Sequence, residues 1–154
     1  MANQPGDAAA FVQEQEGYIC MVIDGYVLNA DTVYHEFSHI IDRRLAWDAQ
    51  IREDALYSEE RWMALQPEGF NYAMSYTDMP EALMRYTDTG YFIGNYSMTY
   101  PTEDRATLMA AAMMRDERFE SSAPMQEKMR FYAQCIRAAF QTEGWPETTA
   151  WERP

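Results

Sequence analysis

Cysteine and histidine are both scarce in this sequence, with two residues of each among 154. The two cysteines, Cys20 and Cys135, lie far apart and form no CxxC pattern, so a disulfide framework is excluded. Long hydrophobic runs are also missing. The longest ones, Ile19–Ile23 and Leu108–Met114, are well short of the roughly 20 residues that a membrane helix needs. We therefore expect no transmembrane segment in this chain.

Positively charged residues are also scarce in this sequence. The chain has 12 Lys and Arg against 25 Asp and Glu, which gives a net charge of −13 and a pI of about 4.4. Such a surface repels phosphate backbones and anionic lipid headgroups, which argues against nucleic acid as a partner. Apolar material is abundant, since 47% of the residues are hydrophobic and 14% aromatic. This is enough for the core of one domain of this length.

The N-terminal residues differ in composition from the rest of the chain. Met1–Ala10 (MANQPGDAAA) is small and polar and has no charged region followed by an apolar run, so we expect no signal peptide in the chain as given. Residues 1–17 are interpreted as a linker and residues 18–154 as a single folded domain.

The pattern of the remaining residues predicts an α+β domain that is mostly helical. Tyr18–Ile23 (YICMVI) is rich in β-forming residues, Asp24-Gly25 is typical of a two-residue hairpin turn, and Tyr26–Leu28 is the expected return strand. Apolar residues at helical spacing then predict a long helix that is capped by Asp31 and extends to about Ala49. We expect the hairpin to pack on this helix.

Four further helices are expected downstream. The residues that mark their starts are Ser58, Asp78, Thr102 and Pro124. The last helix should end at Gly144, after which Trp145–Pro154 is expected to pack back as an irregular strap. Gly69–Pro101 has few clean periods and is interpreted as a long structured excursion. Some of its aromatic residues either pack in the core or line a cleft, among them Tyr72, Tyr76, Tyr91 and Phe92.

One motif carries chemistry. His35-Glu36-Phe37-Ser38-His39 reads HExxH and lies inside the expected long helix. Residues four apart on a helix are about 40° apart around the axis and about 6 Å apart along it, so both imidazoles can reach one metal ion. Glu36 stands beside the pair, where it can reach a water on the open side of the metal without being a ligand. The pattern predicts a zinc site with Glu36 as general base.

A catalytic zinc site usually takes three protein ligands and a water, so a third ligand is needed. Asp42 lies about 10 Å along the helix from His35, too far to share its ion. It is interpreted as orienting a ligand histidine, forming a salt bridge or lying on the surface. No third histidine exists, so an acidic residue of a second helix remains, and Glu103 and Asp104 are the candidates. Adjacent helical residues point about 100° apart, so only one of them should face the metal.

Three segments carry a resemblance to a known family. They are His35–Asp42 (HEFSHIID), Trp62–Tyr72 (WMALQPEGFNY) and Asn95–Ala106 (NYSMTYPTEDRA). They resemble the patterns HEFxHIxD, W-x-x-L-x-P-x-G-F-x-Y and S/N-Y-x-x-T-x-P-x-E-D-x-A of gluzincin-type (HExxH…E) zinc metallopeptidases, in particular a group of small bacterial members that are often envelope lipoproteins. The resemblance extends to Gly144-Trp-Pro and covers nearly everything after Tyr18.

The resemblance implies a zincin-like domain that hydrolyses a peptide or protein substrate with Zn²⁺, in the cell envelope or outside the cell. The metal ligands that it implies are His35, His39 and Glu103. Glu36 would be the general base, and Tyr96 a hydroxyl that faces the metal and hydrogen-bonds the oxyanion. Tyr100 is the alternative hydroxyl, and Tyr96 is then a packed loop residue.

Two features depart from the family pattern. Members commonly read E-D-φ-A-E with φ apolar, where this chain has Arg105 and Thr107, so the contacts around the Glu103 helix stay open. Peptidases of this class also place several strands before the HExxH helix, including an edge strand that aligns an extended substrate. Here either Tyr18–Leu28 supplies that edge, or residues that precede the sequence as given supply it.

Two other classes of function compete with a peptidase. One is a zinc-stabilised binding module with a degenerate or truncated metallopeptidase fold. A structural zinc site usually has four ligands and no adjacent base, whereas three candidate ligands and a base favour an enzyme. The other is a deformylase-like amidase, which would need a cysteine ligand in its own motif. Cys20, in the segment Tyr18–Met21, does not supply one.

Overall fold

The computed structural model describes residues 10–23 and 29–153, and these form a mixed fold dominated by helices. A hairpin of β1 (Ala10–Gln15) and β2 (Tyr18–Ile23) precedes the helices. The helices are α1 (Ala30–Ile51), α2 (Glu59–Met63), α3 (Pro101–Met114), α4 (Glu117–Glu120) and α5 (Ala123–Ala139), with the short 3₁₀ helices η1 (Glu81–Tyr86), η2 (Asn95–Met98) and η3 (Ala150–Glu152). The predicted α+β class is confirmed.

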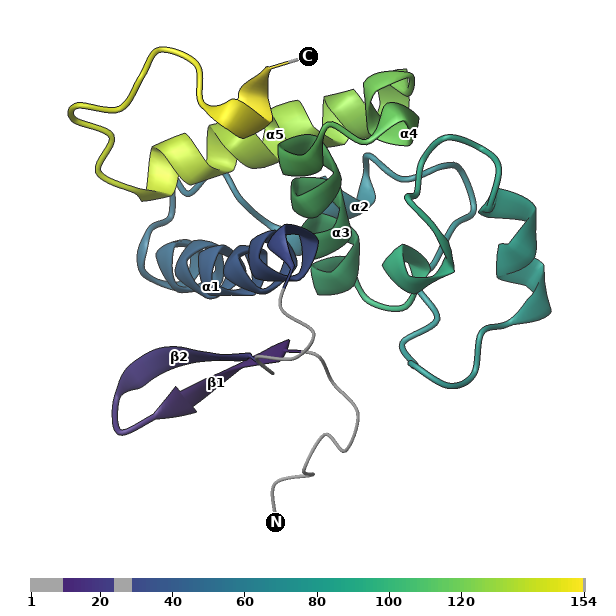
Figure 1. The fold of residues 1–154 in the computed structure, drawn as a ribbon, viewed down its shortest axis with the longest axis horizontal. Coiled ribbons are helices and arrows are strands. Elements are labelled where there is room, and N and C mark those ends of the chain that lie inside the picture. Colours follow the sequence, from purple (N-terminus) through teal and green to yellow (C-terminus); the bar gives the residue numbers. More distant parts are fainter. Residues whose placement is uncertain (1–9, 24–28, 154) are drawn as a thin grey trace.

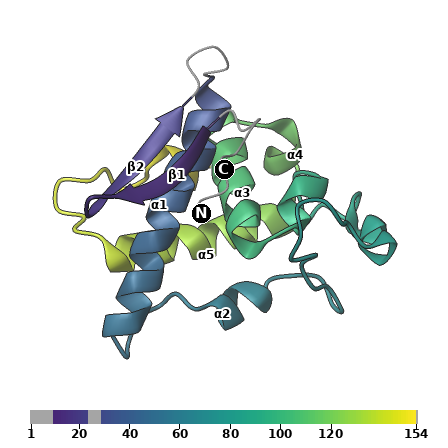
Figure 2. The ribbon, with the colours of Figure 1, turned by 90° about the horizontal axis from the view of Figure 1, so that it is seen from below.

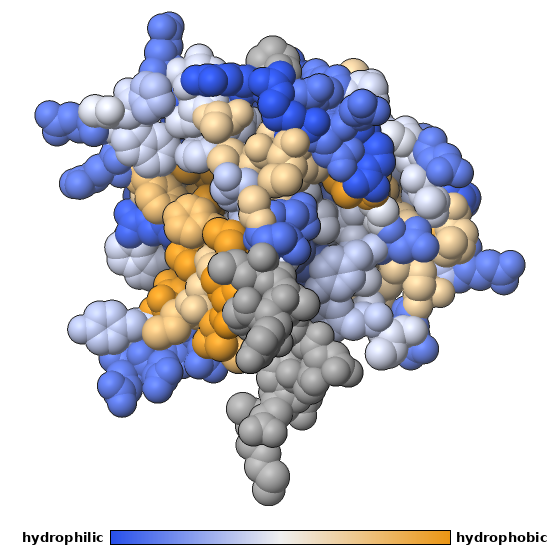
Figure 3. Space-filling model, in the orientation of Figure 1, coloured by the Kyte–Doolittle hydropathy of each residue, from blue (hydrophilic) through white to orange (hydrophobic). Residues whose placement is uncertain are grey.

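The elements stack in layers around α1. This helix lies between the hairpin and α5, and α3 crosses it and makes its most extensive contact (Figure 1). Seen from the hairpin side, β1 and β2 lie over α1 (Figure 2). Apolar residues gather on the surface around the hairpin (Figure 3), and some stay exposed there, including Ile19 and Val22. The candidate site forms beside β1, where α1 meets the start of α3.

Helix α1 owes its position to a narrow buried stripe. Most of its buried residues lie three or four positions from another one, and they are Glu36, Ser38, Ile41, Asp42, Leu45 and Asp48. The stripe mixes apolar with polar side chains, which is unusual for a face that packs on a core. The side chain of Asn29 caps the helix by accepting a hydrogen bond from the Thr32 amide. The predicted cap at Asp31 was wrong by two residues.

Helix α3 is the centre of the molecule. Between Glu103 and Ala112 nearly every side chain is buried, and four of these residues are alanines, which lets neighbouring elements approach closely. A helix that is buried on all sides does not show the alternation of polar and apolar residues that is typical of a surface helix. The core around it includes Leu45 of α1, Trp62 of α2 and Tyr132 of α5, none of which is accessible to solvent.

A buried ion pair joins α3 to α5. Lys128 is completely buried, and its ammonium lies 2.7 Å from the carboxylate of Asp104 and donates to the carbonyl oxygen of Tyr91. Asp104 also accepts a hydrogen bond of 2.6 Å from the Tyr72 hydroxyl. Two buried charges therefore satisfy each other with additional hydrogen bonds, as burial of charge requires.

The hairpin differs from the sequence prediction. The predicted strand Tyr18–Ile23 is confirmed, but its antiparallel partner is Ala10–Gln15, inside the stretch 1–17 that we interpreted as a linker. The turn is Glu16-Gly17, with φ of 52° and 80°. Two-residue hairpin turns need this left-handed conformation, which glycine adopts without strain. The predicted turn Asp24-Gly25 and strand Tyr26–Leu28 lie outside the described residues.

Several helix boundaries also differ. The cap predicted at Ser58 is confirmed, because its side chain accepts from the Arg61 amide. Thr102 is not a cap, since α3 already begins at Pro101. The segment predicted to start at Asp78 is the 3₁₀ helix η1, which begins at Glu81 without a side-chain cap. The last long helix, α5, ends at Ala139 rather than at Gly144, and the short helix α4 was not predicted.

The C-terminal segment agrees with expectation. Residues 140–153 pack back as a mostly irregular strap, held where Arg137 of α5 pairs with Glu152 at 2.5 Å. Cys20 and Cys135 are free thiols. Among the helices in the described ranges, none has the length and apolar character to cross a membrane.

The buried pair predicts a large stability effect for Lys128→Met. Removing the ammonium leaves the Asp104 carboxylate buried without its cation, which typically costs about 3–5 kcal/mol. We expect urea unfolding to show a loss of at least about 3 kcal/mol. Arg115→Gln is the control, because Arg115 pairs with Glu120 on the exposed surface and should cost less than about 1 kcal/mol. Equal losses in the two variants would contradict a dominant role for the buried pair.

Candidate metal centre

Helix α1 places the two histidines of the HExxH motif on one face. The rings of His35 and His39 are 5.0 Å apart between centroids and nearly perpendicular. Their side chains are 16% and 19% exposed, so each is partly enclosed but still open to a cavity. The i, i+4 spacing thus brings the two imidazoles together, as the sequence predicted.

The first turn of α3 brings a carboxylate to the same point. Glu103 Oε2 lies 3.0 Å from His35 Nε2 and 3.5 Å from His39 Nε2. One ligand atom from each of the three residues lies within 4.8 Å of the others, and in the part of the chain that the structure describes these residues form a group that could hold a metal ion. Asp104 points elsewhere, to Lys128 and Tyr72. Of the two acidic candidates, Glu103 is the one that meets the histidines.

The three donors fit a zinc ion. Ligand atoms at about 2.1 Å from a tetrahedral zinc are roughly 3.4 Å from one another, close to the two separations that Glu103 makes with the histidines. Two imidazole nitrogens and one carboxylate oxygen are also a known set for catalytic zinc, which keeps a fourth position for water or substrate. The site opens onto a cavity of about 660 Å³, so that fourth position has room.

Glu36 lies beside the three donors without joining them. It is 7% exposed and lines the same cavity. Burial raises the pKa of its carboxyl group, and Glu103 adds to the rise, whereas His39 and His35 oppose it. A carboxylate with a raised pKa, next to the donors but outside their hydrogen bonds, suits a group that accepts and returns a proton.

Glu103 and His39 each favour the charged form of the other. Burial acts to raise the pKa of Glu103, but hydrogen bonds from His35 and His39 outweigh it and hold the pKa well below its ordinary value. Burial likewise acts to lower the pKa of His39, and the Glu103 carboxylate outweighs it, so the net shift is upward. The site thus keeps Glu103 ionised, as a metal ligand must be.

Three tyrosines border the centre. Tyr76 donates a hydrogen bond of 2.8 Å to Glu103 Oε1, the oxygen that faces away from the histidines. Tyr96, on η2, places its ring 6.0 Å from that of His35. Burial raises the pKa of the Tyr96 phenol and the charge of Glu103 raises it further, so Tyr96 remains a hydrogen-bond donor at neutral pH. Tyr100 instead donates to the carbonyl oxygen of Met74, and its ring packs at a tilt against that of Tyr76.

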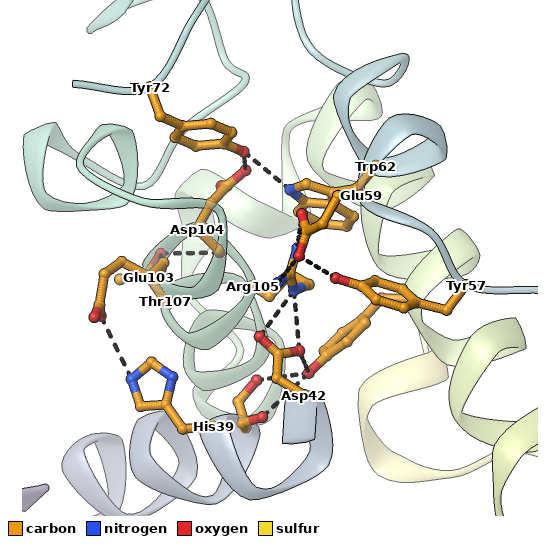
Figure 4. A network of polar contacts seen from close by, with 12 residues as sticks. His39, Asp42, Tyr57, Glu59, Trp62, Tyr72, Glu103, Asp104, Arg105 and Thr107 are labelled. Carbon is orange, nitrogen blue, oxygen red and sulfur yellow. Dashed lines mark hydrogen bonds and ion pairs between the residues drawn. The ribbon is translucent and has the colours of Figure 1, made fainter. Parts of the chain in front are cut away.

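A buried polar network supports the centre from the side of the core (Figure 4). The guanidinium of Arg105 donates to both carboxylate oxygens of Asp42 at 2.9 Å and to Glu59, which also accepts from the Tyr57 hydroxyl. The Tyr132 hydroxyl donates to Asp42 at 2.8 Å. Of the roles considered for Asp42, the salt bridge is the one observed.

The departures from the family pattern have structural explanations. Arg105 stands where family members have an apolar residue, and it reaches back to α1 through Asp42. Thr107 donates from its hydroxyl to the carbonyl oxygen of Glu103 at 2.8 Å, within the helix. Both residues thus make polar contacts at the α3 turn that carries Glu103.

Sequence reasoning missed the bond from Tyr76 to Glu103. Tyr76 was named only as an aromatic residue of a cleft or core, and it precedes its partner by 27 positions, with only η1, η2 and the start of α3 as regular elements between them. Of the four aromatic residues considered there, Tyr76 lines the cavity, whereas Tyr72 and Phe92 are buried in the core and Tyr91 packs against it. No local period signals which of them returns to the site.

The ion pair predicts how His39 titrates in the metal-free protein. Its pKa should lie above 6.5, and Glu103→Gln should lower it, because burial then acts without the carboxylate. Since the folded pKa is above the unfolded value, the pair stabilises the metal-free fold below about pH 6.5 and this contribution is lost as pH rises through the folded pKa. NMR titration of the two histidine rings after chelation tests this. Glu127→Gln, an exposed change on α5, should leave the titration unchanged, and an unaltered His39 pKa in Glu103→Gln would contradict the pairing.

Comparisons of this chain with protein-family models, with curated proteins and with solved structures find no match. A function must therefore be argued from the chain's own residues. The observations available for that argument are the three donors, the adjacent Glu36 and the cavity onto which they open.

Proposed function

We propose that this protein is a zinc-dependent metallopeptidase that hydrolyses peptide bonds, with a zincin-like fold. The observation that carries the proposal is the position of Glu36, a buried carboxylate beside three donors that fit zinc, on a cavity with room for an extended peptide. The resemblance of the HExxH, Trp62–Tyr72 and Asn95–Ala106 segments to gluzincin-type peptidases supports the same class.

The residues of the site fall into two groups, those that would bind the metal ion and those that would take part in the reaction. His35, His39 and Glu103 would hold the ion, and Tyr76 fixes the second oxygen of Glu103 so that the first one stays toward the histidines. When bound, zinc would polarise the scissile carbonyl and lower the pKa of its water to about 7. The protein's own contribution is to keep the three donors together and one side of the site open.

Glu36 would transfer the proton. As a carboxylate it accepts a proton from the attacking water, and as a carboxylic acid it returns that proton to the leaving nitrogen. Its raised pKa reduces the energetic difference between the two states, which favours a group that must occupy both. Tyr96, protonated and beside His35, would donate a hydrogen bond to the oxygen on which charge develops.

The hairpin supplies a surface for the substrate. Ala10, Phe11 and Val12 of β1 line the cavity opposite α1. Within the described residues β1 pairs only with β2, so one edge of β1 carries no strand partner. An extended peptide can add to such an edge through main-chain hydrogen bonds. Under this proposal β1 takes the edge-strand role, for which the sequence had suggested Tyr18–Leu28 or residues that precede the sequence as given.

A zinc-stabilised binding module is the second candidate. The three donors alone are compatible with it, since a module also needs metal ligands. Glu36 argues against it, because burying a carboxylate next to another acidic group costs stability that a purely structural site need not spend. The distinction is therefore whether Glu36 is needed for turnover.

Glu36→Gln tests the proposal directly. We expect it to retain bound zinc but to reduce hydrolysis of a quenched-fluorescence peptide library by about 10²–10⁴-fold, the usual contribution of a general base. Glu127→Gln makes the same chemical change on the exposed surface of α5 and should leave the rate unchanged. Removing the metal with a chelator should abolish the activity, and added zinc should restore it. Zinc-loaded protein that cleaves no peptide of the library would favour the binding module.

A further inference from the structure

One face of α1 forms the floor of the cavity well beyond the metal donors. Glu36, His39, Arg43 and Ala46 all line it, at spacings of three and four residues. Residues at this spacing lie in one row along a helix. The floor therefore leads from the candidate metal centre to a second position, one helical turn further on, that is occupied by Arg43.

Arg43 is the free cation of this cavity. Its side chain is exposed, and it makes no hydrogen bond, ion pair or ring contact with any of residues 10–23 and 29–153. The other guanidinium there, that of Arg105, is 1% exposed and is fully engaged by Asp42 and Glu59. Arg105 holds both of these carboxylates and neither of them pairs with Arg43, although a single guanidinium balances only one of their two negative charges.

The negative charge of the rest of the protein makes the position of Arg43 more selective for a carboxylate. With a net charge of −13, the surface as a whole repels acidic peptides. An unpaired guanidinium at the wall of a cavity attracts a carboxylate locally and can bind it through two parallel hydrogen bonds. An acidic group would thus be admitted at one position of the substrate and disfavoured elsewhere.

We propose that Arg43 is a specificity-determining residue, which binds a carboxylate of the peptide substrate a short distance from the scissile bond. This inference rests on the proposed function. Arg43 is about 6 Å along α1 from His39, and an extended peptide advances about 3.3 Å per residue. The carboxylate therefore lies within about two or three residues of the bond that is cleaved. It belongs either to an Asp or Glu side chain or to the C-terminus of the substrate.

Binding to a protein that cannot turn over tests this without relying on activity. We would load Glu36→Gln with zinc and measure fluorescence anisotropy with labelled hexapeptide libraries that hold Glu, Gln or Lys at one position at a time. Each library is made with a free carboxylate and with an amide at the C-terminus, which separates the two sources. The same measurements are repeated after adding Arg43→Gln or Arg130→Gln. Arg130 lies on the exposed surface of α5, away from this cavity, so the second change controls for net charge.

We expect one carboxylate to tighten binding about tenfold over its neutral counterpart, through Glu at one position or through the free C-terminus. Arg43→Gln should remove this preference and Arg130→Gln should keep it. Arg43→Glu should instead favour Lys at the same position. Peptides that bind without any carboxylate preference, or with one that survives Arg43→Gln, would overturn the inference and leave the peptidase proposal intact. Failure of every library to bind the zinc-loaded protein would overturn both.

Discussion

The buried guanidinium of Arg105 ties the two helices of the site together. It donates to both oxygens of Asp42 at 2.9 Å and is 1% exposed, so this ion pair is shielded from solvent. Asp42 follows His39 by three residues on α1, and Arg105 follows Glu103 by two on α3. The pair therefore fixes, against each other, the two turns that carry candidate metal ligands. Desolvating these charges is costly, so the ion pair is weak evidence for added stability. What the structure shows is that the pair holds the two turns in one defined arrangement.

The first turn of α3 uses three consecutive side chains for three tasks. Glu103 reaches the histidines, Asp104 reaches Lys128, and Arg105 reaches Asp42. Consecutive helical residues point about 100° apart, so each of these contacts limits the rotation of the helix about its axis. A small rotation that moved Glu103 from the histidines would also break two buried ion pairs. In this way the core of the protein, and not only the site itself, sets where the third donor lies.

The sequence revealed those parts of the structure that depend on neighbours along the chain. The pair of histidines followed from the spacing in His35–His39, and the long helix from its apolar period. The choice of Glu103 over Asp104 did not follow from the residues, because it depends on the rotation of α3, which distant ion pairs determine. The contact of Tyr76 with Glu103 has no local signal for the same reason. In the hairpin, Asp24-Gly25 is the more typical turn dipeptide, so the turn observed at Glu16-Gly17 was overlooked.

The most direct test of this account is to measure how much zinc each chain binds when one of the two neighbouring acidic residues is replaced. We would load the parent protein, Glu103→Gln and Asp104→Asn with zinc, remove unbound metal by desalting, and measure zinc per chain by mass spectrometry, with circular dichroism to verify folding. The account predicts about one zinc per chain in the parent and in folded Asp104→Asn, and loss of zinc in Glu103→Gln, consistent with a site of three protein ligands. Full zinc retention in Glu103→Gln, or a folded parent that binds none, would contradict it.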